Sequence, residues 1–191
     1  MKTKILIEVS ARHIHLAQKD LESLFGIGYQ LNKVKDLTQP SDFAAQETLT
    51  IKADNLLKNV RVVGPIRAKT QVEVSITDAI ELGIKLPIRI SGDLKGSAGV
   101  VLIGPKGEVK FEEGAIIAQR HIHCSTKEAK SLKLKNGQVI SVMAGDNREV
   151  IFNNIVVRVG DNYRLCLHID TDEANAAGIN RVGEGILIIK K

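Results

Sequence analysis

One tetrapeptide occurs twice in this chain and restricts the folds that it can adopt. Arg-His-Ile-His stands at residues 12–15 and again at residues 120–123, and a short stretch with helical spacing follows each copy. Each half then continues through short apolar runs to a third polar group, Glu73 or His168, which precedes a Thr-Asp helix start. This order indicates an internal duplication, that is, two related β units with a site between the halves.

Short runs rich in β-branched residues fill most of the remaining sequence. Turn residues separate these runs, for example Gly64-Pro65, Asn136-Gly137 and Gly160-Asp161-Asn162. Many short strands with regular turn signals are typical of barrels and sandwiches. The helices are expected to be short, at residues 17–25, 77–82, 125–132 and 171–177. The chain is therefore predicted to be mainly β.

Composition excludes several classes of partner. The 191 residues carry a net charge of +5, contain no Trp, and have scattered rather than clustered basic residues, so we expect no nucleic-acid partner and favour an anionic small molecule. Two cysteines are too few for a disulfide framework and indicate a reducing compartment. No signal-peptide pattern is present and no apolar run approaches the roughly 20 residues of a membrane span. We expect a soluble cytoplasmic protein without a membrane partner.

The histidines predict metal sites. On a strand, the two imidazoles of His-x-His lie on one face, with Cα atoms roughly 6.5–7 Å apart, and both can reach one ion. A single pair is more often a structural feature, but two copies in matching contexts favour a metal. Glu73 and His168 are the expected third ligands, with an exposed strand carboxylate as the alternative for Glu73. Three protein ligands leave one position open on zinc or a similar ion, as catalytic sites require.

Several other residues have two interpretations each. Arg61 and Arg67 flank Gly64-Pro65 and are either phosphate clamps or solvated surface residues. The glycine-rich stretch 91–99 lacks a Walker ending; it binds phosphate through backbone amides or, as we favour, is a plain turn. Cys166 lies on the same strand face as His168, so its thiol could lie near the metal. We favour the alternative, that Cys166 is a buried structural cysteine. Cys124 is expected to pack under the helix that follows it.

Taken together, these motifs closely resemble the PduL-type phosphotransacylases, also called phosphate propanoyltransferases. The resemblance spans nearly the whole chain. Its matching segments are Val9-Ser10-Ala11-Arg12-His13-Ile14-His15, Val62-Val63-Gly64-Pro65-Ile66-Arg67, Gln71-Val72-Glu73-Val74-Ser75, Ser91-Gly92-Asp93-Leu94, Gln119-Arg120-His121-Ile122-His123 and His168-Ile169-Asp170-Thr171-Asp172-Glu173-Ala174-Asn175-Ala176.

The resemblance implies an enzyme that interconverts acyl-CoA plus phosphate and acyl phosphate plus CoA. It implies two Zn²⁺ ions, one held by His13, His15 and Glu73 and the other by His121, His123 and His168, although other divalent metals also suit these ligands. Arg67 would hold phosphate and serve as the catalytic arginine. The implied CoA contacts are Ser10, Lys35, Arg61, Val63, His168 and Asn175.

The implied fold is two open β-barrel domains capped by short α-helices. The first would span residues 12–118, with 26–45 as a small hairpin insertion; the second would combine residues 1–11 with 119–191, so that the N-terminal strand joins the C-terminal barrel. Only twelve residues precede His13, and they resemble a strand rather than an encapsulation extension. We therefore expect a free cytoplasmic version rather than one in a microcompartment lumen, with acetyl or propanoyl as the acyl group.

For the chemistry we expect metal-assisted direct attack of phosphate on the thioester, because no side-chain nucleophile is required. The alternative is a dinuclear zinc hydrolase acting on thioesters or phosphoesters, and a non-catalytic metal-binding or sensor protein is a further one. A homodimer is expected only because dimers are common among soluble enzymes.

Overall fold

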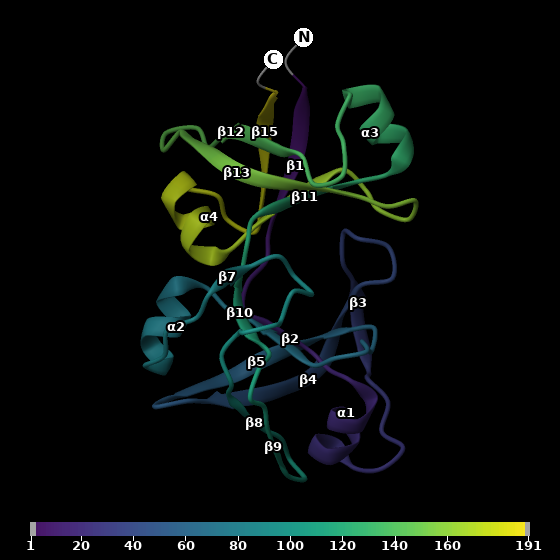
Figure 1. Ribbon diagram of the computed structural model, residues 1–191, viewed down its shortest axis with the longest axis vertical. Coiled ribbons are helices and arrows are strands. Elements are labelled where there is room, and N and C mark those ends of the chain that lie inside the picture. The colour runs from purple at the N-terminus through teal and green to yellow at the C-terminus, as the bar shows by residue number, and fades with distance from the viewer. Residues whose placement is uncertain (1–2, 190–191) are drawn as a thin grey trace. The chain divides into compact units, whose positions relative to one another are not determined.

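The computed structural model describes residues 3–189, which divide into two compact units (Figure 1). The N-terminal unit comprises residues 12–37 and 41–118. The C-terminal unit combines the stretch ending at Ala11, residues 38–40, and the stretch from Gln119 onward. Each unit has its own apolar core.

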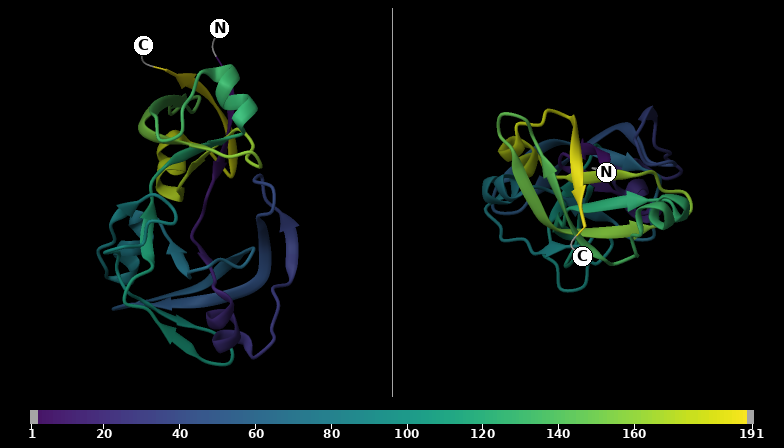
Figure 2. Two further views of the ribbon diagram at one scale, coloured as in Figure 1. Left: turned by 45° about the vertical axis from the view of Figure 1, so that its right-hand side comes forward. Right: turned by 90° about the horizontal axis from the view of Figure 1, so that it is seen from above.

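The C-terminal unit is a closed six-stranded barrel, which is seen from above in Figure 2. Its strands follow the order β1-β14-β11-β13-β12-β15 around the barrel. β1 runs parallel to β14 and antiparallel to β15, so the N-terminal strand does join the C-terminal barrel, as expected. The bounds are β1 (Lys4–Val9), β11 (His121–Cys124), β12 (Val139–Ala144), β13 (Val150–Val159), β14 (Cys166–Ile169) and β15 (Val182–Ile188), with helices α3 (Thr126–Leu132) and α4 (Thr171–Ala177).

Alternation along β1 explains why this strand completes the barrel. Ile5 and Ile7 are buried in the apolar core, whereas Leu6 and Glu8 lie on the opposite, outer face. Pairing on both sides of β1 leaves this sheet without a free edge. The sequence analysis predicted an open barrel, but this barrel is closed.

The N-terminal unit is a curled nine-stranded sheet of the order β7-β10-β6-β2-β5-β4-β8-β9, with β3 paired to β4. β3 and β4 are antiparallel and form a hairpin within the 26–45 region. The bounds are β2 (His13–His15), β3 (Lys33–Asp36), β4 (Phe43–Lys52), β5 (Leu56–Gly64), β6 (Gln71–Glu73), β7 (Ile88–Arg89), β8 (Val101–Ile103), β9 (Glu108–Lys110) and β10 (Ala115–Ala118), with helices α1 (Gln18–Phe25) and α2 (Ile76–Leu82).

The two units share one internal arrangement. β2 is parallel to β5 and antiparallel to β6, just as β11 is parallel to β13 and antiparallel to β14. A short helix follows β2, β6, β11 and β14 in turn. The mainly β, duplicated, helix-capped architecture predicted from the sequence is thus confirmed.

Candidate metal centres

The N-terminal unit brings His13, His15 and Glu73 together. Ile14 between the histidines is fully buried in the core, so both imidazoles lie on the other face of β2. Their Nε2 atoms are 3.1 Å apart, and Glu73 lies directly across from His13 on β6. Its Oε2 is 3.7 Å from Nε2 of His13, and its Oε1 is 4.0 Å from Nε2 of His15. Zinc ligands with bonds of about 2.0–2.2 Å lie roughly 3.4 Å apart in a tetrahedron, so this donor set fits such an ion.

His15 is held in the form that binds metals. Its Nδ1 lies 3.0 Å from the Val63 carbonyl oxygen and donates to it, which leaves the Nε2 lone pair directed at His13 and Glu73. Burial, followed by the nearby charges of His13 and Arg67, lowers the pKa of His15 well below 6.5. A neutral imidazole does not have to lose a proton before it binds an ion.

The Glu73 carboxylate is oriented by two neutral side chains. The Gln71 amide and the Ser91 hydroxyl both donate to Oε1, the latter at 2.7 Å, so Oε2 is the oxygen that faces His13. Gln71 is itself fixed, because the Gly92 amide donates to its Oε1 at 2.8 Å. The Ser91-Gly92 segment is therefore a turn that supports the carboxylate.

The C-terminal unit gathers the other three predicted ligands. His121 and His123 lie on β11, and His168 on β14 lies directly across from His121. The ring centroids are 4.7 Å apart for His121–His123, 5.1 Å for His123–His168 and 5.4 Å for His121–His168. Nδ1 of His121 donates to the Gln119 carbonyl at 2.9 Å, and the Tyr163 ring stacks on His123 at 4.3 Å.

The predicted third ligands, Glu73 and His168, occupy the same position in both repeats. Glu73 pairs with His13 in the way that His168 pairs with His121. The helix after each begins two residues later, at the N-caps Ser75 and Asp170. Counted from the Thr-Asp pairs, Glu73 stands four residues before Thr77 and His168 three before Thr171. Counted from the helix caps this difference disappears, because the α2 cap is Ser75, whose hydroxyl accepts from the Asp78 amide.

The arginines of the repeated motif point away from the histidines. Arg12 pairs with Asp78 and Arg120 with Glu173, each at 2.6 Å. Each carboxylate also closes the capping box of its own helix, Asp78 in α2 and Glu173 in α4. Each arginine thus ties a histidine strand to a helix, and neither is a ligand.

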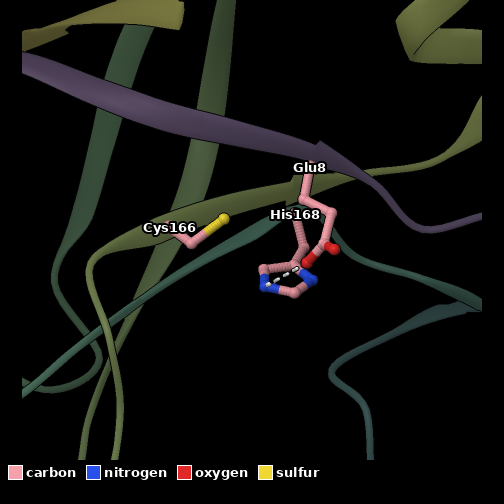
Figure 3. A group of neighbouring side chains, drawn as sticks. All are labelled: Glu8, Cys166 and His168. Atoms are coloured by element: carbon pink, nitrogen blue, oxygen red, sulfur yellow. Dashed lines mark ion pairs between the residues drawn. The ribbon is translucent and has the colours of Figure 1, made fainter. Parts of the chain in front are cut away.

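A second group of ligand atoms lies in the C-terminal unit (Figure 3). Within residues 3–189, three ligand atoms come within 4.8 Å of one another in only two groups: His13, His15 and Glu73, and then Glu8, Cys166 and His168. The histidines 121, 123 and 168 do not converge to this degree. Burial, with a smaller contribution from the Glu8 charge, raises the pKa of the Cys166 thiol to about 12.

The remaining predicted site residues divide between the units. Arg67 is half-buried and close enough to His15 to lower its pKa, while its backbone amide donates to the Leu16 carbonyl at 2.9 Å. Arg61 lies across from His13 and donates to the Ala45 carbonyl at 2.8 Å. Of the predicted CoA contacts, Lys35, Arg61 and Val63 lie in the N-terminal unit, and Ser10, His168 and Asn175 in the C-terminal unit.

The sequence analysis did not identify the residues that contact the predicted metal ligands. Two of them could have been found from the sequence: Gln71 stands two residues before Glu73 and so on the same face of β6, and Glu8 is a carboxylate within an apolar strand. Ser91 and Tyr163 lie in loops, where no periodicity predicts a contact.

Comparison with known proteins identifies the family. The phosphate propanoyltransferase family model matches residues 6–180 of this chain. The chain belongs to the phosphate propanoyltransferase family. Its relatives include phosphate propanoyltransferases of Lachnoclostridium phytofermentans, 52% identical over 91% of this chain and 82% of the relative, and of Thermotoga maritima, 48% identical over 97% and 89%. The Salmonella typhimurium phosphate propanoyltransferase is 49% identical over 91% of this chain and 83% of its own length.

Membership of this family confirms the resemblance predicted from the motifs and confirms that the chain is an enzyme of the acyltransferase class. In the described part of the chain, no helix is both long and apolar enough to cross a membrane.

Proposed function

We propose that this member of the phosphate propanoyltransferase family interconverts acyl-CoA plus phosphate and acyl phosphate plus CoA, with acetyl or propanoyl as the acyl group. The observation that supports this most is the convergence of His13, His15 and Glu73 with the charge of Arg67 beside them. An open three-ligand metal set next to a guanidinium suits a reaction between a thioester and a phosphate anion.

His13, His15 and Glu73 would hold one Zn²⁺, and His121, His123 and His168 would hold a second. When bound, zinc supplies positive charge that stabilises a thiolate sulfur and polarises a carbonyl oxygen. The protein contributes ligand orientation: the Val63 carbonyl fixes the tautomer of His15, and the Gln119 carbonyl does the same for His121.

Arg67 would bind phosphate through paired hydrogen bonds and align one phosphate oxygen with the acyl carbon. That oxygen forms the new bond as the carbon–sulfur bond breaks, and CoA leaves as its thiolate. No side-chain nucleophile takes part, so trapping of an acyl-enzyme from acyl-CoA without phosphate would refute direct attack.

The residues that we propose as CoA contacts are Ser10, Lys35, Arg61, Val63, His168 and Asn175. Arg61 and Lys35 are exposed and cationic, which suits the phosphates of the nucleotide end of CoA. Val63 has a further role that does not depend on CoA, because its carbonyl positions His15.

The deciding assay measures thiol release from acetyl-CoA and propanoyl-CoA by zinc-loaded protein, with and without phosphate. The proposal requires release that depends on phosphate and yields acyl phosphate. Release without phosphate would make the chain a hydrolase, and no release under either condition would favour a metal-binding or sensor role. Metal analysis and light scattering would test the proposed two zinc ions and the homodimer.

Two arginine variants separate the substrates. Arg67→Ala should raise the KM for phosphate by roughly 10–150-fold, the equivalent of about 1.5–3 kcal/mol for hydrogen bonds to a charged group. Arg61→Ala is the matched control and should raise the KM for CoA instead. If Arg67→Ala changes both KM values equally, its assigned role is wrong.

A further inference from the structure

The outer face of the C-terminal barrel carries a carboxylate, a thiol and an imidazole on neighbouring strands. β1 runs parallel to β14, which places Glu8 directly beside His168. Cys166 lies two residues before His168 and therefore on the same face of β14. Ile7, which precedes Glu8, and Leu167, which lies between Cys166 and His168, are fully buried in the barrel core, so the three polar side chains lie on the opposite face.

The three side chains converge (Figure 3). Nε2 of His168 is 3.9 Å from Oε2 of Glu8, and one ligand atom from each of Glu8, Cys166 and His168 lies within 4.8 Å of the other two. Ligands of a tetrahedral zinc ion are roughly 3.4–3.6 Å apart for bonds of about 2.0–2.3 Å. Small side-chain rotations would close this difference, because all three groups already face one another.

The donor types narrow the choice of ion. Sulfur, nitrogen and a carboxylate oxygen together suit a thiophilic divalent ion such as Zn²⁺, whereas Mg²⁺ and Ca²⁺ prefer oxygen alone. The other cysteine provides a contrast: Cys124 has the opposite parity on β11 and packs in the apolar core of the same barrel.

We propose that Glu8, Cys166 and His168 form a metal-binding group that takes Zn²⁺ or another thiophilic divalent ion. His168 belongs both to this group and to the three-histidine set, so an ion bound here competes with one held by His121 and His123. Because His168 is also a ligand of the proposed second zinc site, the inference bears on that site, but metal ligation alone tests it, without the acyl-transfer assay.

Cobalt substitution tests the proposal, because a thiolate ligand gives Co²⁺ an intense near-ultraviolet charge-transfer band that nitrogen and oxygen ligands do not. We expect this band in the wild-type protein and in Cys124→Ser, and its loss in Cys166→Ser. Glu8→Gln should keep the band but weaken cobalt affinity by at least the roughly 10–100-fold that loss of an outer-shell partner costs. Glu184→Gln, on the adjacent strand β15, should have no effect.

The proposal is overturned if the wild type lacks the band or if the band persists in Cys166→Ser. Glu8 would then be a partner that only orients His168. X-ray absorption on the zinc-loaded wild type needs no variant and decides the matter if Cys166→Ser does not fold. A sulfur neighbour at about 2.3 Å from zinc supports the proposal, and a shell of nitrogen and oxygen alone refutes it. Both measurements omit acyl-CoA and phosphate, so acyl-transfer activity does not affect their outcome.

Discussion

Ser91→Ala should weaken metal binding in the N-terminal unit without unfolding it. The Ser91 hydroxyl donates to Oε1 of Glu73 at 2.7 Å, and Oε2 of the same carboxylate faces His13. Removing the hydroxyl takes away one donor to Oε1, while the Gln71 amide still donates to it, and lets the carboxylate rotate away from the histidines. The substitution removes no ligand atom, so any loss of affinity measures orientation.

The size of the effect follows from this one contact. A hydrogen bond to a charged group contributes about 1.5–3 kcal/mol. Because about 1.4 kcal/mol corresponds to a tenfold change in binding, the metal affinity should fall by roughly 10–150-fold. This range overlaps the roughly 10–100-fold loss seen when an outer-shell partner is removed from a metal ligand.

Competition with a chromophoric zinc chelator at constant pH measures the affinity. Ser97→Ala is the control: Ser97 lies in the same segment, and its hydroxyl bonds only to the backbone of Leu94 and Gly114. It should cost folding stability and leave zinc affinity unchanged. Zinc binding by Ser91→Ala at the wild-type affinity, or an equal loss in Ser97→Ala, would refute the orienting role of Ser91.

Three further predictions probe the fold. Ile7→Ala should destabilise the C-terminal barrel by about 2–5 kcal/mol, because Ile7 is buried and its truncation leaves a cavity. Leu6→Ala should cost much less, because Leu6 is 39% exposed. Equal urea midpoints for the two variants would contradict the assigned strand parity. Burial alone raises the pKa of Glu47, but hydrogen bonds from Asn32 and its neighbours outweigh this and lower it below 4.5. The stability that Glu47→Gln removes should therefore be present above pH 4.5 and decline as pH falls below it, and a loss that is constant with pH would count against this cause. Ser125→Ala should cost about 0.5–2 kcal/mol by removing the α3 cap, and Ser125→Asp should restore most of it in the same urea assay.

The sequence was most informative where local geometry determines the outcome. Strand alternation is a property of the backbone, so His13 and His15 could be assigned to one face from their spacing alone. The repeat added Glu73 and His168, because equivalent positions in a duplication have equivalent neighbours. These predicted ligand sets needed no knowledge of which strands are adjacent.

Contacts between strands distant in sequence could not be derived in this way. Glu8 meets His168 only because β1 pairs with β14. The family resemblance implied that the N-terminal strand joins the C-terminal barrel, but nothing in the sequence named its partner strand. Closure of the barrel depends on β15 pairing with both β1 and β12, which the sequence does not specify. The short strand β9 escaped prediction because Glu108–Lys110 has only three residues, with Val109 as the single apolar one, which is too short for an alternation to be recognised.

The position of β1 sets an order for folding during synthesis. Ile7 pairs with Leu167, and at about 5–20 residues per second roughly 8–30 s separate their exit from the ribosome. All of the N-terminal unit is made in that interval, while β1 has no partner strand. We expect nascent chains halted before β14 to protect residues 41–118 from protease and to lose β1, whose apolar face would meanwhile be open to chaperones.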